Sequence, residues 1–294
     1  MSIRVLMGNI IGHLLLQGRM SGLNIDNKIL SIYFHNPCRR VFEECIKYLK
    51  DRKYKFLSID ELYSIISKRE QVSGNHVFIS LDDAWRGNLS NVIPFVERNK
   101  IPITIFTPVQ PLNDGVLWLK WFRDEELIDK CSDEYPELKR RVPKSLLTAV
   151  RNNIWNKLRD LKSYPREIMT EAEIQKLSES PFITIEGHTM THPILTKCDE
   201  WDLEYELNVS KEKLEALLGS PVSYMAYPNG DYNDNIVEAC QRYNYKMAFT
   251  TEQRMIDVPS DNLYKLPRQC VPNGYGKYES LARMLGLWNK MLRV

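Results

Sequence analysis

Residues 77 to 83 read Val77-Phe78-Ile79-Ser80-Leu81-Asp82-Asp83, a largely apolar run that ends in two adjacent carboxylates. Such a run predicts a buried strand. Comparable β-rich runs recur, with segments of helical period between them, at residues 29–35, 101–107, 182–186, 222–227 and 245–250. This alternation predicts an α/β fold in which helices wrap a parallel sheet. Capping boxes predict helix starts at two further places, residues 58–61 and 170–173.

The overall composition is that of a globular protein. The 294 residues suffice for one large α/β domain or two small ones, and 43% of them are hydrophobic and 27% charged. Forty Lys and Arg residues against thirty-eight Asp and Glu residues give a formal net charge of +2, so we expect no nucleic-acid partner. The six cysteines are scattered without a C-x-x-C pair, which favours reduced thiols.

The two ends of the chain leave the localisation open. Residues 1–28 contain an apolar stretch that resembles a signal sequence, but Asn9 and His13 interrupt it, so we expect a retained segment. Residues 276–294 place apolar side chains at helical spacing, which fits either a helix docked on the domain or a peripheral membrane contact. No stretch reaches the about 20 apolar residues that cross a bilayer. We therefore expect a protein that is cytoplasmic or peripheral to the membrane, with secretion not excluded.

Residues 112–165 interrupt the alternation of strands and helices. The segment is long, rich in Trp and basic residues, and has a helical apolar pattern. It follows a strand at the end where ligand-binding loops gather in α/β folds. Two interpretations stay open, a wall or lid over a site and a helical excursion that covers a sheet edge.

A pair of histidines is the second chemical feature. His188 and His192 stand in Glu186-Gly187-His188-Thr189-Met190-Thr191-His192-Pro193, and the chain has only five histidines. Two imidazoles and a carboxylate suit Zn²⁺ and leave positions for water and substrate. The histidines share one face only if the segment is helical or tightly coiled. Alternation along the strand sends Asp82 and Asp83 in different directions, so one can bind a metal while the other acts as a base. The alternative for the aspartates alone is a helix N-cap.

These motifs resemble those of the polysaccharide deacetylase family, also called the NodB-homology or carbohydrate esterase family 4 group. Residues 80–85 resemble the first family motif, with Ala84 where glycine is typical, and residues 187–193 match the second closely. The resemblance covers about residues 31–268 and implies an irregular, incomplete (β/α) barrel. It also implies Asp82 as the catalytic base, with Asp83, His188 and His192 as ligands of a divalent ion. That ion is expected to be Zn, with Co, Ni or Mn as alternatives.

The third family motif is altered in this chain. Residues 226–233 keep the proline and a Gly-Asp-Tyr tail, but Ala226 and Asn229 replace the usual arginine and tyrosine. The resemblance implies that the backbone N–H of Asn229 holds the oxyanion, with Tyr227 beside it on the substrate. Arg268 resembles an arginine that replaces the missing one in a subset of members. Its alternative is a structural ion pair.

No histidine follows His192, although most members supply a general acid from a late histidine. In members that resemble exopolysaccharide poly-N-acetylglucosamine deacetylases, the subset this chain resembles most, a histidine on the first strand serves instead. His35 stands at the matching position, and the alternative is a core histidine. Trp85 is the candidate platform for a sugar ring. Trp118 and Trp121 are either further platforms or packing residues.

The sequence therefore predicts a terminal segment (1–28), a catalytic domain (29–275) and a C-terminal amphipathic helix (276–294). The expected function is metal-dependent hydrolysis of the N-acetyl group of a sugar in a polysaccharide or cell-envelope glycan, which is the expected partner. Two alternatives stay open, a catalytically weak glycan-binding relative and an O-acetyl carbohydrate esterase. The sugar, the chain length and the oligomeric state are left undetermined.

Overall fold

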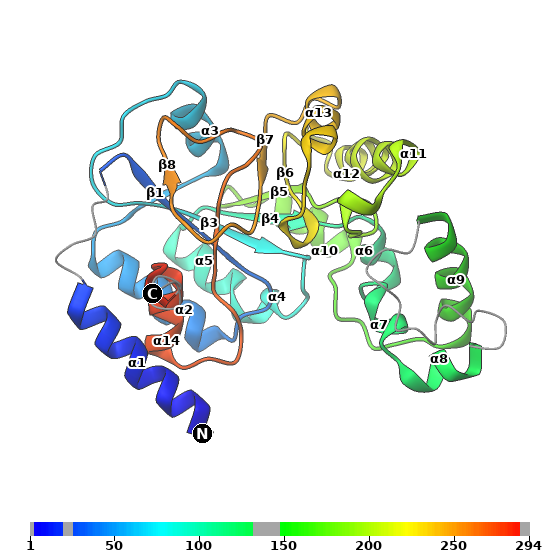
Figure 1. The fold of residues 1–294 in the computed structure, drawn as a ribbon, viewed down its shortest axis with the longest axis horizontal. Coiled ribbons are helices and arrows are strands. Elements are labelled where there is room, and N and C mark those ends of the chain that lie inside the picture. Colours follow the sequence, from blue (N-terminus) through cyan, green and yellow to red (C-terminus); the bar gives the residue numbers. More distant parts are fainter. Residues whose placement is uncertain (1–2, 20–25, 132–147, 289–294) are drawn as a thin grey trace.

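The computed structural model describes residues 3–19, 26–131 and 148–288. Its centre is one curled sheet in the order β7-β6-β5-β4-β3-β1-β8, with β2 beside β3 and β9 beside β1 (Figure 1). The strands are β1 (Lys28–Phe34), β2 (Lys55–Leu57), β3 (His76–Asp82), β4 (Ile103–Thr107), β5 (Ile183–Gly187), β6 (Tyr224–Ala226), β7 (Met247–Phe249), β8 (Ile256–Asp257) and β9 (Gln269–Cys270). Every described pair is parallel except β1 with β8. The predicted α/β barrel of irregular, incomplete type is confirmed.

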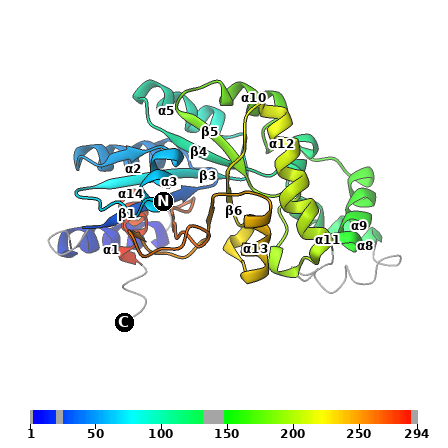
Figure 2. The ribbon, with the colours of Figure 1, turned by 90° about the horizontal axis from the view of Figure 1, so that it is seen from above.

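Helices surround this sheet (Figures 1 and 2). They are α1 (Ile3–Arg19), α2 (Arg39–Asp51), α3 (Ile59–Ser67), α4 (Asn88–Asn91), α5 (Ile93–Asn99), α6 (Gln110–Asp114), α7 (Leu119–Phe122), α8 (Glu125–Cys131), α9 (Thr148–Leu161), α10 (Glu171–Ser178), α11 (Glu200–Leu203), α12 (Ser210–Leu218), α13 (Asp234–Arg242) and α14 (Lys277–Met284). Three short irregular helices are η2 (Leu195–Lys197), η3 (Glu204–Val209) and η4 (Pro228–Gly230). Both predicted capping boxes form, at Ser58 and Thr170.

The curl of the sheet divides the apolar residues of each strand between two cores. On β3, Val77, Ile79 and Leu81 belong to the core between sheet and outer helices, whereas Phe78 belongs to the core inside the curl. Phe78 stacks on Phe249 of β7 with ring centroids 5.2 Å apart, although β3 and β7 are not neighbours in the sheet. Because side chains alternate along a strand, Asp82 points into the curl with Phe78.

Strand register brings the carboxyl ends of four strands to one level. Phe34 of β1 pairs with Leu81 of β3, so His35 lies level with Asp82. Asp82 in turn pairs with Phe106 of β4, and Thr107 pairs with Gly187 of β5. His188 and Asp83 therefore leave the two strands that flank β4, at the same edge of the sheet.

The segment predicted as an insertion forms a small helical body at one end of the molecule (Figures 1 and 2). In the part that is described, α7, α8 and α9 enclose their own apolar core, which includes Trp118, Trp121 and Trp155. Both predicted alternative platforms, Trp118 and Trp121, are thus packing residues. Trp118 Nε1 donates a hydrogen bond to the carbonyl of His192, 3.2 Å away, which favours the wall over the simple edge cover.

The described part of the C-terminal segment docks on the domain. Leu281, Met284, Leu285 and Trp288 are buried, and α14 packs against α1 and α2. Met291 and Leu292, which continue the stripe, lie outside the described residues. Among the described helices, none is both long enough and apolar enough to cross a bilayer.

Candidate functional site

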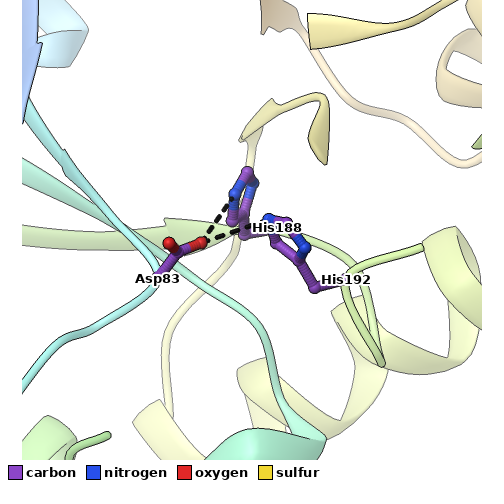
Figure 3. Close-up of side chains that lie close together, drawn as sticks. All are labelled: Asp83, His188 and His192. Atoms are coloured by element: carbon purple, nitrogen blue, oxygen red, sulfur yellow. Dashed lines mark ion pairs between the residues drawn. The ribbon is translucent and has the colours of Figure 1, made fainter. Parts of the chain in front are cut away.

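Three predicted metal ligands converge at the carboxyl edge of the sheet (Figure 3). Asp83 Oδ1 lies 3.3 Å from His188 Nε2 and 3.2 Å from His192 Nε2. Two ligand atoms bound at about 2.0–2.1 Å to one tetrahedral ion lie about 3.3 Å apart, so these separations suit a shared cation. Asp83 Oδ1 is buried and accepts no hydrogen bond from the described protein atoms, as expected of an atom that awaits a metal. The residues present therefore fit a divalent ion.

Asp83 is fixed by its backbone and by a tryptophan. Its N–H donates to the carbonyl of Phe106 at 3.0 Å, and its Oδ2 accepts from Trp85 Nε1 at 3.0 Å, which leaves Oδ1 for the cation. Burial alone would raise the pKa of Asp83, but the imidazoles of His192 and His188 hold that pKa well below its usual range. The ligand is thus a carboxylate before any metal arrives.

The chain turns sharply after Asp82. Asp83 and Ala84 both have positive φ, 72° and 52°, a conformation that costs an L-residue about 1–2 kcal/mol. The second of these residues occupies the position where the family motif has glycine. The backbone conformation explains that preference, because glycine adopts positive φ without a steric penalty.

The tautomer of His188 follows from its partner. His188 Nδ1 lies 2.7 Å from the carbonyl oxygen of Ala226, which can only accept, so Nδ1 carries the proton. Nε2 faces Asp83 Oδ1 and the cation position, and it is the nitrogen that would bind the cation. A hydrogen bond that orients a ligating histidine in this way is typical of metal sites.

The segment between the histidines is a tightly coiled loop, which is the second of the two conformations that the sequence left open. Thr189 and His192 adopt positive φ, 69° and 59°, and Thr189 Oγ1 accepts from the N–H of His192 at 3.0 Å. This tight coil brings the two imidazole centroids to 4.8 Å from each other. The histidines meet through a strained backbone rather than through helical periodicity.

Glu206, which the sequence analysis missed, holds this loop from behind. It is fully buried on η3, a π-helical segment. Its carboxylate accepts from the N–H groups of Met190 at 3.0 Å and Thr191 at 2.8 Å, and from Thr191 Oγ1 at 2.5 Å. In sequence it is one acid in a run of charged helical residues, which carries no signal of burial. A π-helical irregularity near a site is a recurrent functional device.

Glu186 anchors the strand that precedes the loop. Its Oε2 accepts from the N–H groups of Ser223 at 2.9 Å and Tyr224 at 2.8 Å, which joins β5 to the start of β6. Burial raises the pKa of Glu186 to about 8, although these two N–H groups oppose the shift.

The predicted base, Asp82, is paired with Arg268 inside the curl. Arg268 Nη1 and Nη2 donate to the two carboxylate oxygens at 2.7 and 2.9 Å, a bidentate pair. Arg268 also donates to Ser80 Oγ at 3.0 Å and to the carbonyl of Thr250 at 3.1 Å. The arrangement supports the prediction that Arg268 takes the place of the missing third-motif arginine. The side chain of Arg268 is fully buried, so it lies against Asp82 and not at a surface open to substrate.

His35 stands at the open rim of the site. Its Nε2 lies 3.9 Å from Asp83 Oδ2, whereas the two ligating histidines lie near the other carboxylate oxygen, Oδ1. Its side chain is 44% exposed, so the core-histidine alternative is wrong. The imidazole is accessible to a substrate, and its role as general acid stays a prediction.

The third motif lines the site with backbone. Ala226 supplies the carbonyl that orients His188, and Asn229 has a φ of 61° at an exposed turn. Tyr227 is fully buried and donates its hydroxyl to the carbonyl of Tyr264 at 3.0 Å, so the predicted contact of its side chain with substrate is wrong. The oxyanion role of the Asn229 N–H and the platform role of the half-buried Trp85 stay predictions.

Comparison with known proteins agrees with this geometry. The model of the polysaccharide deacetylase family matches residues 69–248. The chain is 22% identical over 232 residues to the poly-β-1,6-N-acetyl-D-glucosamine N-deacetylase of Staphylococcus epidermidis strain RP62A, covering 79% of this chain and 66% of that protein. It is 26% identical over 129 residues to the YxkH protein of Bacillus subtilis strain 168, covering 44% of this chain and 43% of that protein. The chain thus spans less than two thirds of these relatives.

Solved structures share the fold. IcaB from Ammonifex degensii superposes with a TM-score of 0.63 at 14% identity, covering 89% of this chain and 97% of that one. The Streptococcus pyogenes deacetylase PplD, solved with acetate, gives a TM-score of 0.61 at 17% identity, covering 88% and 98%. With a family match over more than half of its length and the Asp-His-His cluster at the expected edge of a curled parallel sheet, the chain belongs to the polysaccharide deacetylase family.

Proposed function

We propose that this protein is a metal-dependent deacetylase that hydrolyses the N-acetyl group of an N-acetylated sugar in a polysaccharide or cell-envelope glycan. The observation that carries the proposal is the convergence of Asp83, His188 and His192 on one point beside the buried Asp82–Arg268 pair. The name of the Staphylococcus epidermidis relative supports an amide of N-acetylglucosamine as the bond that is cleaved.

Asp83, His188 and His192 would hold the cation, and Zn²⁺ suits this donor set best, with Co, Ni or Mn as alternatives. When bound, such an ion polarises a carbonyl and lowers the pKa of water. Asp82 accepts the proton of the attacking water, and Arg268 keeps this carboxylate oriented. His35 donates a proton to the departing amine nitrogen. The N–H of Asn229 stabilises the oxyanion, and the products are acetate and a free amino sugar.

The test uses two adjacent isosteric variants. Asp82→Asn should keep the metal and lose about 10²- to 10⁴-fold in acetate release, the usual contribution of a general base. Asp83→Asn should lose the metal itself. Metal content is measured on the purified proteins, and acetate release is measured on N-acetylglucosamine oligomers before chelation, after chelation and after addition of Zn²⁺ or Co²⁺.

Each outcome separates the alternatives. Equal, negligible acetate release from wild type and Asp82→Asn, with oligomer binding retained, would replace the enzyme by a glycan-binding protein. Faster release from acetylated xylan than from N-acetylglucosamine oligomers would favour the O-acetyl esterase. Wild-type protein that releases acetate at full rate after complete metal removal would overturn the metal-dependent mechanism.

A further inference from the structure

Helix α1 packs one face tightly on α14. Gly8 and Gly12 stand one turn apart on this face, and a Cβ at Gly12 would fall 2.5 Å from the backbone of Tyr278. Asn9 Oδ1 accepts from the N–H of Tyr278 at 3.0 Å, which fixes the crossing. The small residues of α1 are therefore already used for a helix contact within the chain.

The opposite face of α1 is apolar and uncovered. Its large side chains are between 49% and 79% exposed, and five of the eight exposed large hydrophobics of the described chain lie here: Ile3, Leu6, Met7, Ile10 and Leu14. Ile3, Met7, Ile10 and Leu14 recur at helical spacing and form one stripe. We call the five exposed residues, Leu6 included, the α1 stripe. Exposed apolar surface that is concentrated in this way usually marks an interaction site.

Charge around the α1 stripe is positive. Helix α1 contains no Asp or Glu, and it carries Arg4 in its first turn. Arg4 donates to the hydroxyl of Tyr275 at 3.1 Å on the exposed side, and Lys277 is exposed at the start of α14. The nearest acid below the helix, Glu279, is buried and paired with Arg283 at 2.8 Å. The surface offers cations at its rim and a neutral apolar centre.

We propose that the α1 stripe docks on an anionic phospholipid surface, with α1 lying in the plane of the interface. In its described residues, helix α1 is not both long enough and apolar enough to cross a bilayer. The stripe is about 16 Å long and no wider than the about 10 Å of a helix. The five partly exposed side chains offer less accessible surface than the about 800 Å² that each partner buries in a stable protein interface, which argues against a second copy. Apolar side chains between basic residues match acyl chains beneath anionic headgroups.

The proposed surface is separate from the metal cluster and does not depend on the proposed function. Helix α1 lies at the end of the molecule opposite α8 and α9 (Figures 1 and 2). Docking through α1 would therefore leave the helical insertion directed away from the lipid.

The test is co-sedimentation of the full chain with vesicles of phosphatidylglycerol and phosphatidylcholine, and with phosphatidylcholine alone. Met7→Gln/Ile10→Gln/Leu14→Gln should lower partition onto anionic vesicles at least tenfold. The matched control, Leu161→Gln/Trp201→Gln, removes exposed apolar side chains elsewhere and should bind as wild type does. Arg4→Gln/Lys277→Gln should bind anionic vesicles several-fold more weakly and lose the salt dependence of binding. Circular dichroism verifies that each variant is folded.

Three results would overturn the proposal. Wild type could stay in the supernatant with every vesicle composition. The triple variant could sediment as wild type does. Sedimentation analysis without lipid could show a dimer that the triple variant dissolves, which would assign the α1 stripe to a second copy. A loss of acetate release in any assay leaves this proposal untouched, since vesicle binding is measured without substrate.

Discussion

The carboxylate half and the imidazole half of the site are built by different means. Asp82 and Asp83 end a strand that is paired on both sides, and Arg268 holds Asp82 from within the curl. His188 and His192 lie on a loop with two residues of positive φ, and Glu206 holds that loop from outside the sheet. The first half depends on sheet register and one ion pair. Positive φ occurs in both halves, but the second half is a loop that depends on hydrogen bonds to the carboxylate of Glu206.

The largest effect is expected where the carboxylate half is broken. Arg268→Leu leaves Asp82 buried without its partner, which should cost about 3–5 kcal/mol of unfolding free energy, measured by urea denaturation. Arg268→Lys is the control, because it keeps the charge and loses the bidentate geometry, so it should cost less. Equal stability of Arg268→Leu and wild type would show that the pair does not hold this half together.

The next largest effect is expected at His35, which lies at the rim of the carboxylate half. His35→Ala removes the proposed acid while leaving all three metal ligands in place, so acetate release should fall about 10²-fold with metal content unchanged. The decisive measurement is kcat compared between His35→Ala and wild type over a range of pH. A variant that keeps the full wild-type profile would require another acid.

The imidazole half is tested by Glu206→Gln. An amide cannot accept all three hydrogen bonds from Met190 and Thr191, so the loop should loosen and metal affinity should fall about 10- to 100-fold, as for other residues that orient metal ligands. Competition with a chromophoric chelator measures this affinity. Thr191→Val, which removes only the hydroxyl bond, should give an intermediate loss. Unchanged affinity in both variants would leave Glu206 a purely structural residue.

The smallest effect concerns Glu186, which like Glu206 is a buried carboxylate in the imidazole half of the site. Its pKa in the folded protein is raised to about 8, above the value of an unfolded chain, so the folded state binds more protons between about pH 4.5 and 8. Stability contributed by this group is therefore present at low pH and lost as pH rises through 8. Denaturation of wild type should show a decline of up to about 1 kcal/mol per pH unit that Glu186→Gln lacks. Parallel pH profiles for the two proteins would contradict the shift.

The sequence was most informative where interactions are local. The strand that ends in Asp82 and Asp83 was predicted from its apolar run, and alternation predicted that the two carboxylates diverge, as they do. Both capping boxes were likewise visible as four-residue patterns. Such features need no knowledge of the rest of the chain.

Features that depend on distant partners were not predictable. The sequence left open whether the histidines meet on a helix or in a tight coil, and the coil forms with positive φ at Thr189 and His192, next to backbone N–H groups that Glu206 accepts from. Tyr227 was expected at the substrate, but the curl of the sheet turns it into the core. The short strands β2, β8 and β9 carry too few residues for a periodic signal. In each case tertiary packing decides a conformation that the local pattern leaves open.

The pairing of Asp82 with Arg268 also has a consequence for biosynthesis. The two residues are far apart in the sequence, since their numbers differ by 186. A ribosome exposes the first and second motifs long before the guanidinium that neutralises Asp82 is translated. Until then the inside of the curl holds an uncompensated negative charge, which disfavours closure of the barrel. The nascent chain is therefore expected to complete its active centre only after Arg268 has been translated.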